Sequence, residues 1–583
     1  MKHRLIFMAV VLALLMLCGC EEAPVEVITV GQIHTAATGR ELYDLFAADA
    51  DTSYIDGTGR PRREDDGTAV FQNGESLPVE GFEEQQMVRS DGEYLYILDA
   101  GDLKIVRMNG GESTLLSTTG VWEEENEDRY ETARGLYVSG TTVGVLIDAE
   151  VFGDSATVST YTDQCTLRLY DVSDPENPKR YAELAQDGYL MDSRMHNGVV
   201  YLVSTDYKLA PDDGEKASYL PAVSNNGKGE MLALDHIFIC PAPSARAYTV
   251  VSAIDLESAE RLDACAFTSE SSSAYMNEHG LYLARTVTET QTKEPTTEDG
   301  LTVTESVQSS NTELKRIQLV EKKLTLTEMT QVSGKILNRY AMDFSQNALR
   351  VLTADDSKRT KTYEGENAPE PTTQEHLAET NVFTLQEDLQ PMASLSGIAE
   401  GQNIYSARLI DDVAYLITYN RQAPLVAIDL SDPKAPQLLE NTGAVGTAGY
   451  LHRFDKDSLF GLGLSEQYQL QAEILDVSDP NDITLESQLE LPYSWSEALY
   501  NPKAALMDAQ KELLGFPAEK VYVLLELDGK ELKERGAVDF PYYSQNTRAI
   551  VQDDMLYLCD PQALVVAELD TLTIQKTITF GAG

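Results

Sequence analysis

The 583-residue chain has few basic residues for its size. Lys and Arg number 45 against 95 Asp and Glu, which gives a formal net charge of −50. Such a charge repels the phosphates of nucleic acids and the headgroups of anionic lipids, so we expect no nucleic-acid partner and no electrostatic docking on a membrane. An acidic surface also keeps an exposed protein soluble.

Cysteine is scarce and lacks metal-binding spacing. The six residues are Cys18, Cys20, Cys165, Cys240, Cys265 and Cys559. No CxxC pair occurs, so a zinc site or a thioredoxin-type motif is unsupported. If the chain is exported, Cys240 and Cys265, which flank one predicted strand, form the expected disulfide. The alternative is that the four internal cysteines are buried thiols.

Motifs for hydrolysis and metal binding are also missing. The chain has no G-x-S-x-G and no HExxH, and its seven histidines are scattered. Residues 49–59 place acidic side chains at alternate positions, but Tyr54 stands where an EF-hand loop needs Gly. We therefore expect no cofactor, with calcium at this segment as the weaker alternative.

The only long apolar run, Leu5–Leu17, lies at the N-terminus behind Lys2 and Arg4. It is too short for an ordinary transmembrane helix and has the layout of an export signal. It ends in Leu17-Cys18-Gly19-Cys20, which resembles a bacterial lipobox. We predict a lipoprotein signal peptide at 1–19, lipidation of Cys20, and an extracytoplasmic protein anchored by lipid to a bacterial membrane. An ordinary signal peptide is the alternative.

Residues 20–80 are polar and acidic, and we interpret them as a tether and edge segment with one helical candidate at 39–49. From residue 81 to 583, short strand-like runs follow acidic or Gly turns. Examples are "DGEYLYILD" (91–99), "NGVVYLVST" (197–205), "DDVAYLITY" (411–419) and "DDMLYLCD" (553–560).

A second motif recurs three times as "DVSDPENP" (171–178), "DLSDPKAP" (429–436) and "DVSDPNDI" (476–483). The Asp before each proline, Asp174, Asp432 or Asp479, can accept from backbone N–H groups just ahead, and the proline ends the strand ladder. The motif therefore predicts a hairpin between the outer strands of a repeated unit.

Asp429 and Asp476 are 47 residues apart, close to the ~40–50 residues of a four-stranded propeller blade. We predict an all-β propeller of about eight antiparallel blades, with seven as the alternative. The interval 497–580 is long enough for two blades, or for one blade and a closing strand. The polar insertions 207–230, 288–313 and 355–380 lack apolar periodicity and are expected to be surface loops.

The segments "YSARLIDDVAYLITYNRQAPLVAIDLSDPKAPQLL" (405–439), "YLHRFDKDSLFGLGL" (450–464) and "VEGFEEQQMVRSDGEYLYIL" (79–98) resemble a known family. It is the secreted bacterial β-propeller domain family, an uncharacterised group of cell-surface proteins. The resemblance extends over residues 40–580 and implies the fold. It supplies no catalytic residue.

These observations favour a binding or scaffold module for a protein, peptide or glycan partner at the cell envelope, and we expect a monomer. Tyr493, Trp495 and Tyr500 form the best candidate for an aromatic binding surface. The alternative is an exported enzyme acting on polysaccharide or peptide, with paired carboxylates at the central channel. The missing motifs favour the non-enzymatic hypothesis.

Lipidation is directly testable. Radiolabelled fatty acid fed to the host is expected to attach to the exported chain at Cys20. An exported chain that carries no label would contradict the lipoprotein prediction.

Overall fold

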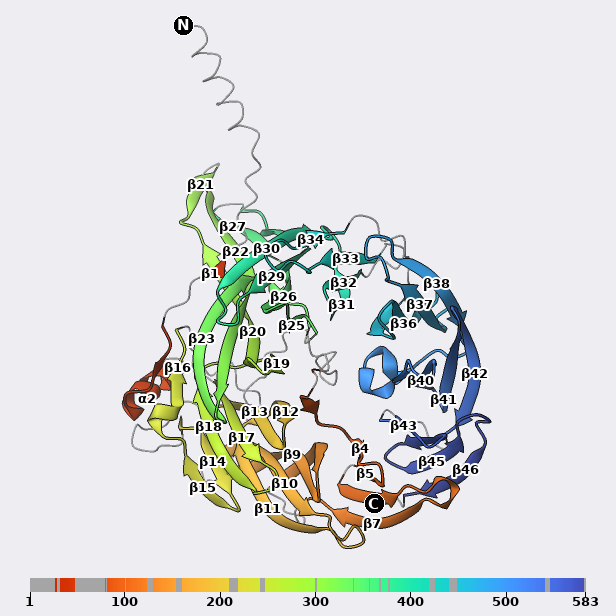
Figure 1. Ribbon diagram of the computed structural model, residues 1–583. Coiled ribbons are helices and arrows are strands. Elements are labelled where there is room, and N and C mark those ends of the chain that lie inside the picture. The colour runs from red at the N-terminus through yellow and green to blue at the C-terminus, as the bar shows by residue number, and fades with distance from the viewer. Residues whose placement is uncertain are drawn as a thin grey trace.

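The computed structural model describes residues 27–28, 32–47, 79, 81–99, 101–122, 129–153, 160–208, 219–241, 247–298, 301–338, 340–355, 357–365, 368–375, 378–418, 425–439, 448–540 and 546–580. In these residues, nine β-sheets, whose main ladders are antiparallel, are arranged in a ring around a central axis (Figure 1). The propeller prediction is confirmed, but the sheets number nine, not about eight. The difference arises in 497–580, which holds two complete sheets.

The main ladder of each sheet is built from strands that follow one another along the chain, with its first strand toward the centre of the ring and its last toward the rim (Figure 1). Sheets 1 to 3 contain β4 (Val88–Ser90), β5 (Tyr94–Asp99), β6 (Asp102–Arg107) and β7 (Thr114–Gly120); β8 (Arg129–Ser139), β9 (Thr142–Gly153), β10 (Thr160–Asp171) and β11 (Lys179–Asp187); and β12 (Tyr189–His196), β13 (Val199–Tyr207), β17 (Ala247–Asp255) and β18 (Glu260–Phe267). Sheets 4 to 6 contain β19 (Ser273–Asn277), β20 (Gly280–Thr292), β22 (Leu301–Val320) and β23 (Lys323–Ser333); β24 (Lys335–Ile336), β25 (Met342–Ser345), β26 (Ala348–Asp355), β29 (Glu379–Leu385) and β30 (Pro391–Ile398); and β31 (Ile404–Ile410), β32 (Val413–Thr418), β33 (Val426–Asp429) and β34 (Gln437–Leu438). Sheets 7 to 9 contain β35 (Ala448–Arg453), β36 (Ser458–Leu464), β37 (Leu470–Asp476) and β38 (Thr484–Glu490); β39 (Leu506–Asp508), β40 (Leu513–Ala518), β41 (Val521–Asp528) and β42 (Glu531–Asp539); and β43 (Arg548–Gln552), β44 (Met555–Cys559), β45 (Ala563–Glu568) and β46 (Ile574–Thr579).

The second strand of a sheet is buried on both faces, which explains its nearly continuous apolar sequence. In β44, Leu556 and Leu558 pack toward sheet 8, while Tyr557 and Cys559 pack toward sheet 1. Successive side chains of a strand point to opposite faces, so both alternating sets are apolar when a sheet lies on each side. The recurrent aromatic-aliphatic runs are therefore strands between two neighbouring sheets.

The three Ser-Asp-Pro turns have the predicted hydrogen bonds. Each joins the third strand of a sheet to the fourth: β10 to β11, β33 to β34 and β37 to β38. The carboxylate of Asp432 accepts from the Lys434 N–H at 3.0 Å, and that of Asp479 accepts from the Asn481 N–H at 3.0 Å. Asp174 does the same for Glu176 at 3.2 Å. The same local turn recurs because these three sheets make the same corner between their third and fourth strands.

The ring closes by packing between the first and last sheets. Leu95 and Val106 of sheet 1 share a buried cluster with Leu564 and Val566 of sheet 9. The Tyr557 hydroxyl accepts the Gly110 N–H across the same seam at 3.0 Å. In the described residues, side-chain packing and not an exchanged strand closes the ring, because sheet 1 consists of β4 to β7 and sheet 9 of β43 to β46.

Part of the expected tether belongs to the folded body. Strand β1 (Val27–Ile28) pairs with β23, and β2 (His34–Thr35) pairs with β16 (Ile237–Ile239) beside sheet 3. Helix α2 (Gly39–Ala47) matches the helical candidate, and the Thr38 hydroxyl caps it by accepting the Glu41 N–H at 3.2 Å. The Phe46 ring of α2 packs 4.8 Å from that of Tyr248. No described helix is long and apolar enough to cross a membrane.

The three polar insertions were expected to be loops, and this expectation is wrong for much of their length. They contribute strands, which are β14 (Ala222–Asn225), β15 (Lys228–Met231), β21 (Thr296–Glu298), β27 (Lys358–Glu364), β28 (Thr372–Glu375) and the extended ends of β20 and β22. Threonine-rich segments have high β-propensity even without apolar alternation, and here they extend existing ladders.

The expected disulfide is absent, because Cys240 and Cys265 are both free and buried. The parallel pairing of β16 with β18 places Phe238 opposite Phe267, and the Cys240 N–H donates to Thr268 Oγ1 at 3.0 Å. Cys240 therefore lies at least three residues along the strand from Cys265, roughly 10 Å. A disulfide needs Cα atoms within about 7 Å. Burial raises the pKa of the Cys240 thiol to about 11.

Truncation at the closing seam should destabilise the whole ring. Leu564 is completely buried between sheets 9 and 1, so Leu564→Ala is expected to lower the free energy of unfolding by about 2–5 kcal/mol. Ile574→Ala in β46, where the side chain is 43% exposed, serves as the control and should change it by less than about 0.5 kcal/mol. Urea unfolding measures both, and equal small effects would argue against a closed seam.

Candidate functional site: a pocket on the turn face and the inner wall

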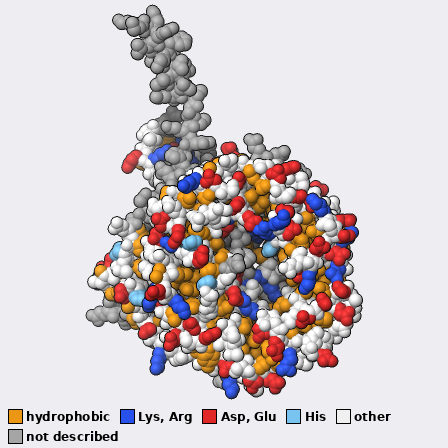
Figure 2. All heavy atoms as spheres, in the orientation of Figure 1, with side chains coloured by type: hydrophobic (Ala, Val, Ile, Leu, Met, Phe, Trp, Pro, Cys, Tyr) orange, Lys and Arg blue, Asp and Glu red, His pale blue; other side chains and the backbone are white. Residues whose placement is uncertain are grey.

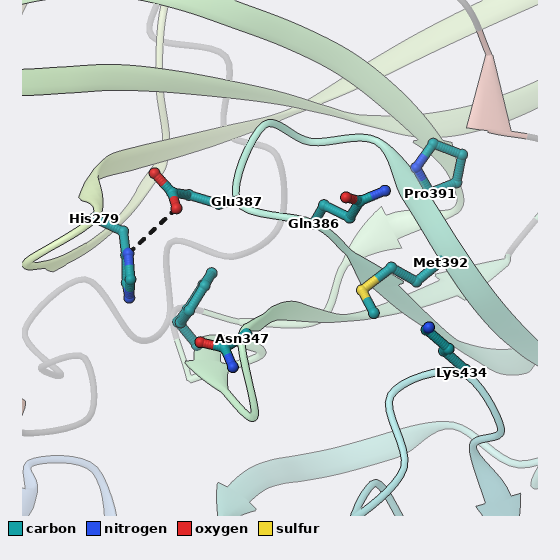
Figure 3. A pocket seen from close by; sticks show the side chains of 8 residues that line it. His279, Asn347, Gln386, Glu387, Pro391, Met392 and Lys434 are labelled. Carbon is teal, nitrogen blue, oxygen red and sulfur yellow. Dashed lines mark ion pairs between the residues drawn. The ribbon is translucent and has the colours of Figure 1, made fainter.

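A pocket of ≈ 540 Å³ lies among the turns of sheets 4, 5 and 6. It is lined by His279, Phe344, Asn347, Gln386, Glu387, Pro391, Met392 and Lys434 (Figure 3). These residues come from the β19–β20, β25–β26, β29–β30 and β33–β34 connections and from the adjoining parts of β25 and β30. Three sheets that pack through one buried cluster thus hold the pocket walls in fixed positions.

One wall is a tight turn that brings His279 to the pocket. Asn277 accepts the His279 N–H at 2.8 Å, and Gly280 follows with φ +149°. A Cβ on Gly280 would lie 2.7 Å from the carbonyl oxygen of Ile317, so only glycine fits there. The imidazole of His279 packs against Phe344 with ring centroids 4.5 Å apart.

Glu387 lies at the pocket edge between the side chains of His279 and Arg316. Its carboxylate is 3.4 Å from His279 Nδ1, as the dashed line in Figure 3 marks, and it also pairs with buried Arg316. Arg316 Nη2 donates to the His279 carbonyl at 2.8 Å, and the Tyr282 hydroxyl donates to the Glu387 carbonyl at 3.3 Å. These contacts fix Glu387 and compensate its charge.

Lys434 is different because its ammonium group has no carboxylate partner among the described residues. It follows Pro433 in the second Ser-Asp-Pro turn, and Figure 3 shows its side chain extending toward Met392. The pocket thus combines an aromatic ring, a thioether and amide groups with one available positive charge. Such a mixture suits a polar ligand with some apolar surface.

A second feature is the wall of the central hollow, which Figure 2 shows with Lys and Arg side chains beside it. Residues 81–87, which we call the inner segment, run along this wall before β4. Strand β3 (Glu83–Glu84) pairs with β12, and Gln86 forms a bridge with Leu136 of β8. Lys503, in the 3-10 turn η7 (Pro502–Ala504), donates to the Gln85 carbonyl. The inner segment therefore connects sheets 3, 2 and 8.

The innermost elements carry a series of cations. They include Arg89, Arg134, Arg194, Arg408, Arg453, Lys503 and Arg548. Six of these cations contact carboxylates. The pairs are Arg89 with Glu83, Arg134 with Asp148, Arg194 with Glu84 and Asp192, Arg453 with Asp411, Lys503 with Glu84, and Arg548 with Glu497. The exception is Arg408.

The enzyme hypothesis requires two facing carboxylates with raised pKa values at the channel. Burial raises the pKa of Glu497, but its carboxylate is 3.0 Å from Arg548 and also accepts from Asn501 at 2.7 Å. The other inner carboxylates named above lie beside arginines or a lysine. Among the described residues, this arrangement is one of ion pairs and not of an acid–base pair.

The predicted aromatic surface lies on the connection between sheets 7 and 8. Tyr493 is half-buried against the shared core of those sheets, Trp495 is also half-buried, and Tyr500 is exposed. A binding role for them stays a prediction. Cys20 and the calcium candidate at 49–59 lie outside the described residues. The described residues contain no cluster of ligands for a metal ion.

Sequence reasoning missed both the pocket and the inner-wall arginines. The pocket joins side chains up to 155 residues apart, and no local pattern signals that proximity. The arginines did have a signal, because an Arg occurs two to five residues before the turn in "VRSD", "SRMHN", "ARLID" and "TRAIVQD". That repetition marks the innermost strands of sheets 1, 3, 6 and 9.

Comparison with known proteins agrees with this architecture. The family model described as Beta propeller domain matches residues 76–572. The chain belongs to this family. An uncharacterized protein of Archaeoglobus fulgidus is 28% identical over 239 residues, which cover 41% of this chain and 34% of that protein. The chain therefore spans about a third of that relative.

A second relative, the uncharacterized protein MJ1554 of Methanocaldococcus jannaschii, is 23% identical over 479 residues, covering 71% of this chain and 72% of that protein. Both relatives are archaeal, so they lend no support to the expected bacterial origin. Among solved structures, Hsv2p of Kluyveromyces lactis aligns with 69% of this propeller chain and 96% of its own, at 10% identity and a TM-score of 0.32. A functionally unknown protein from Desulfotomaculum acetoxidans aligns with 56% and 91%, at 10% identity and a TM-score of 0.30.

The inner wall predicts a specific pH dependence. Burial lowers the pKa of His452 on β35, so the folded protein keeps this ring neutral where an unfolded chain protonates it. Its contribution to stability is therefore present above about pH 6.5 and is lost as the pH falls toward the lower folded-state value.

We expect His452→Asn to flatten the decline in unfolding free energy between about pH 7 and pH 5.5. Urea unfolding at several pH values measures the slope, and His34→Asn, at a side chain 54% exposed, is the control. A His452→Asn slope equal to that of the unmodified protein would contradict the argument.

Proposed function

We propose that this propeller is a non-enzymatic binding or scaffold module of the cell envelope. In this proposal it is exported, anchored by lipid at Cys20, and presents the pocket among sheets 4 to 6 to a protein, peptide or glycan partner. The observation that carries the proposal is the pocket itself, whose walls are held by three packed sheets. It combines Phe344 and Met392 with Lys434, which has no carboxylate partner among the described residues.

The arrangement of charge supports recognition more than catalysis. Glu387 and the inner-wall carboxylates that could serve as acids or bases lie in ion pairs with arginine or lysine. A carboxylate fixed by a charge-assisted hydrogen bond is a weak base at neutral pH. Rigid turns with varied side chains, in contrast, are typical of binding surfaces on propellers.

The test is capture of a partner from the host envelope with the mature protein lacking its signal, run beside a glycan array. Phe344→Ala and Lys434→Ala are expected to reduce the recovered signal about tenfold or more, since each removes a contact worth at least ~1.4 kcal/mol. Lys456→Ala is the matched control, because that side chain is 83% exposed and lies outside the pocket.

Retention of the signal in both pocket variants would place recognition elsewhere on the molecule. Absence of any signal from both the envelope and the glycan array would contradict the binding proposal itself.

A further inference from the structure

Arg408 is held at the inner wall by aromatic rings from two other sheets. It lies on β31, the innermost strand of sheet 6, and its guanidinium carbon is 3.8 Å from the ring centroid of Tyr340. The ring of Tyr450, on innermost strand β35, is 5.9 Å away. Stacking between aromatic faces fixes the plane of the guanidinium and orients its N–H edge.

The charge of Arg408 is not compensated within the described part of the chain. The side chain is only 8% exposed, and its Nε and Nη1 donate to the carbonyls of Leu451 (3.3 Å) and Ala407 (3.0 Å). No described carboxylate pairs with it, in contrast to the other six inner-wall cations. Burial consequently lowers its pKa from the ordinary value. An isolated buried cation is costly unless an anion accompanies it.

Two neighbouring side chains, Tyr450 and His452, define the polar surroundings of Arg408. The Tyr450 hydroxyl is buried and has no hydrogen-bond partner. Buried hydroxyls are nearly always satisfied, so one beside an unpaired guanidinium indicates a missing acceptor. His452 lies 6.1 Å from Tyr450, centroid to centroid, and its Nδ1 is 2.6 Å from the Arg453 carbonyl, which requires it to donate. Its ring adds no positive charge when neutral.

We propose that Arg408 and Tyr450 form a carboxylate-binding site on the inner wall between sheets 5, 6 and 7. The planar guanidinium matches the two oxygens of a carboxylate, and the Tyr450 hydroxyl supplies a further donor. This site shares no residue with the pocket lined by Lys434, so it goes beyond the proposed function.

The local charge argues for a monocarboxylate. Arg408 provides one uncompensated positive charge, which a single carboxylate neutralises. A phosphate monoester carries nearly two negative charges and would need a second free cation, which the described wall does not provide. The net charge of −50 further disfavours polyanions. The carboxylate can belong to a small acid or to the C-terminus of a peptide.

The test uses two probes that differ only in the carboxylate, N-acetylglycine and N-acetylglycinamide, with the mature full-length protein at constant ionic strength. Ligand binding to the folded state raises the melting temperature in a concentration-dependent manner. We expect the acid, and not the amide, to raise it. Arg408→Met should abolish the response, and Tyr450→Phe should weaken the apparent affinity about tenfold.

Arg453→Met is the matched control, since Arg453 lies on the adjacent inner strand but pairs with Asp411, and its response should equal that of the unmodified protein. If Arg408→Met does not fold, Arg408→Lys keeps the charge but loses the planar fork, and it should bind more weakly. A tripeptide with a free C-terminus, compared with its amide, distinguishes a peptide end from a small acid. Equal responses to acid and amide, or an unchanged response in the Arg408 and Tyr450 variants, would overturn the proposal.

Discussion

The packing of each sheet against its two neighbours is the constraint on which the rest of the structure depends. A single four-stranded sheet with apolar residues on both faces has no stable form in water, because both faces must be covered. The ring satisfies this requirement for all nine sheets only if the first and last also meet. The buried cluster shared by Leu95, Val106, Leu564 and Val566 is therefore a condition for the fold as well as a local contact.

This packing also determines where chemistry can be placed. The innermost strands are brought together around the hollow, so cations separated by more than 450 residues in sequence lie on one wall. In a protein with such an excess of acidic residues, most of these cations are compensated by carboxylates. Arg408 stands apart because, among the described residues, it contacts aromatic rings and pairs with no acid. Side chains in the turns between strands do not have to pack against a neighbouring sheet. Lys434 can therefore belong to a recurring Ser-Asp-Pro turn and also line a pocket.

The sequence was sufficient to predict the propeller, because its signals are local. The Ser-Asp-Pro corner depends on bonds within four residues, and helix α2 depends on its cap at Thr38 and its apolar face. The number of sheets was harder to predict, since sheets 8 and 9 lack that corner. Insertions such as 288–313 were misinterpreted as loops because they have no apolar pattern of their own. Their strands form by extending ladders that already exist in the sheet. The predicted Cys240–Cys265 disulfide is wrong because the register between β16 and β18 keeps the two cysteines apart, and spacing along the chain does not reveal that register.

Amide hydrogen exchange of the native protein, resolved by peptide, tests ring closure most directly. Closure predicts that β5 and β6 of sheet 1 and β44 and β45 of sheet 9 are protected as strongly as β36 and β37 of sheet 7. In an open array, the two terminal sheets would each expose an apolar face and would exchange through local unfolding. Markedly faster exchange confined to sheets 1 and 9 would contradict the closed ring.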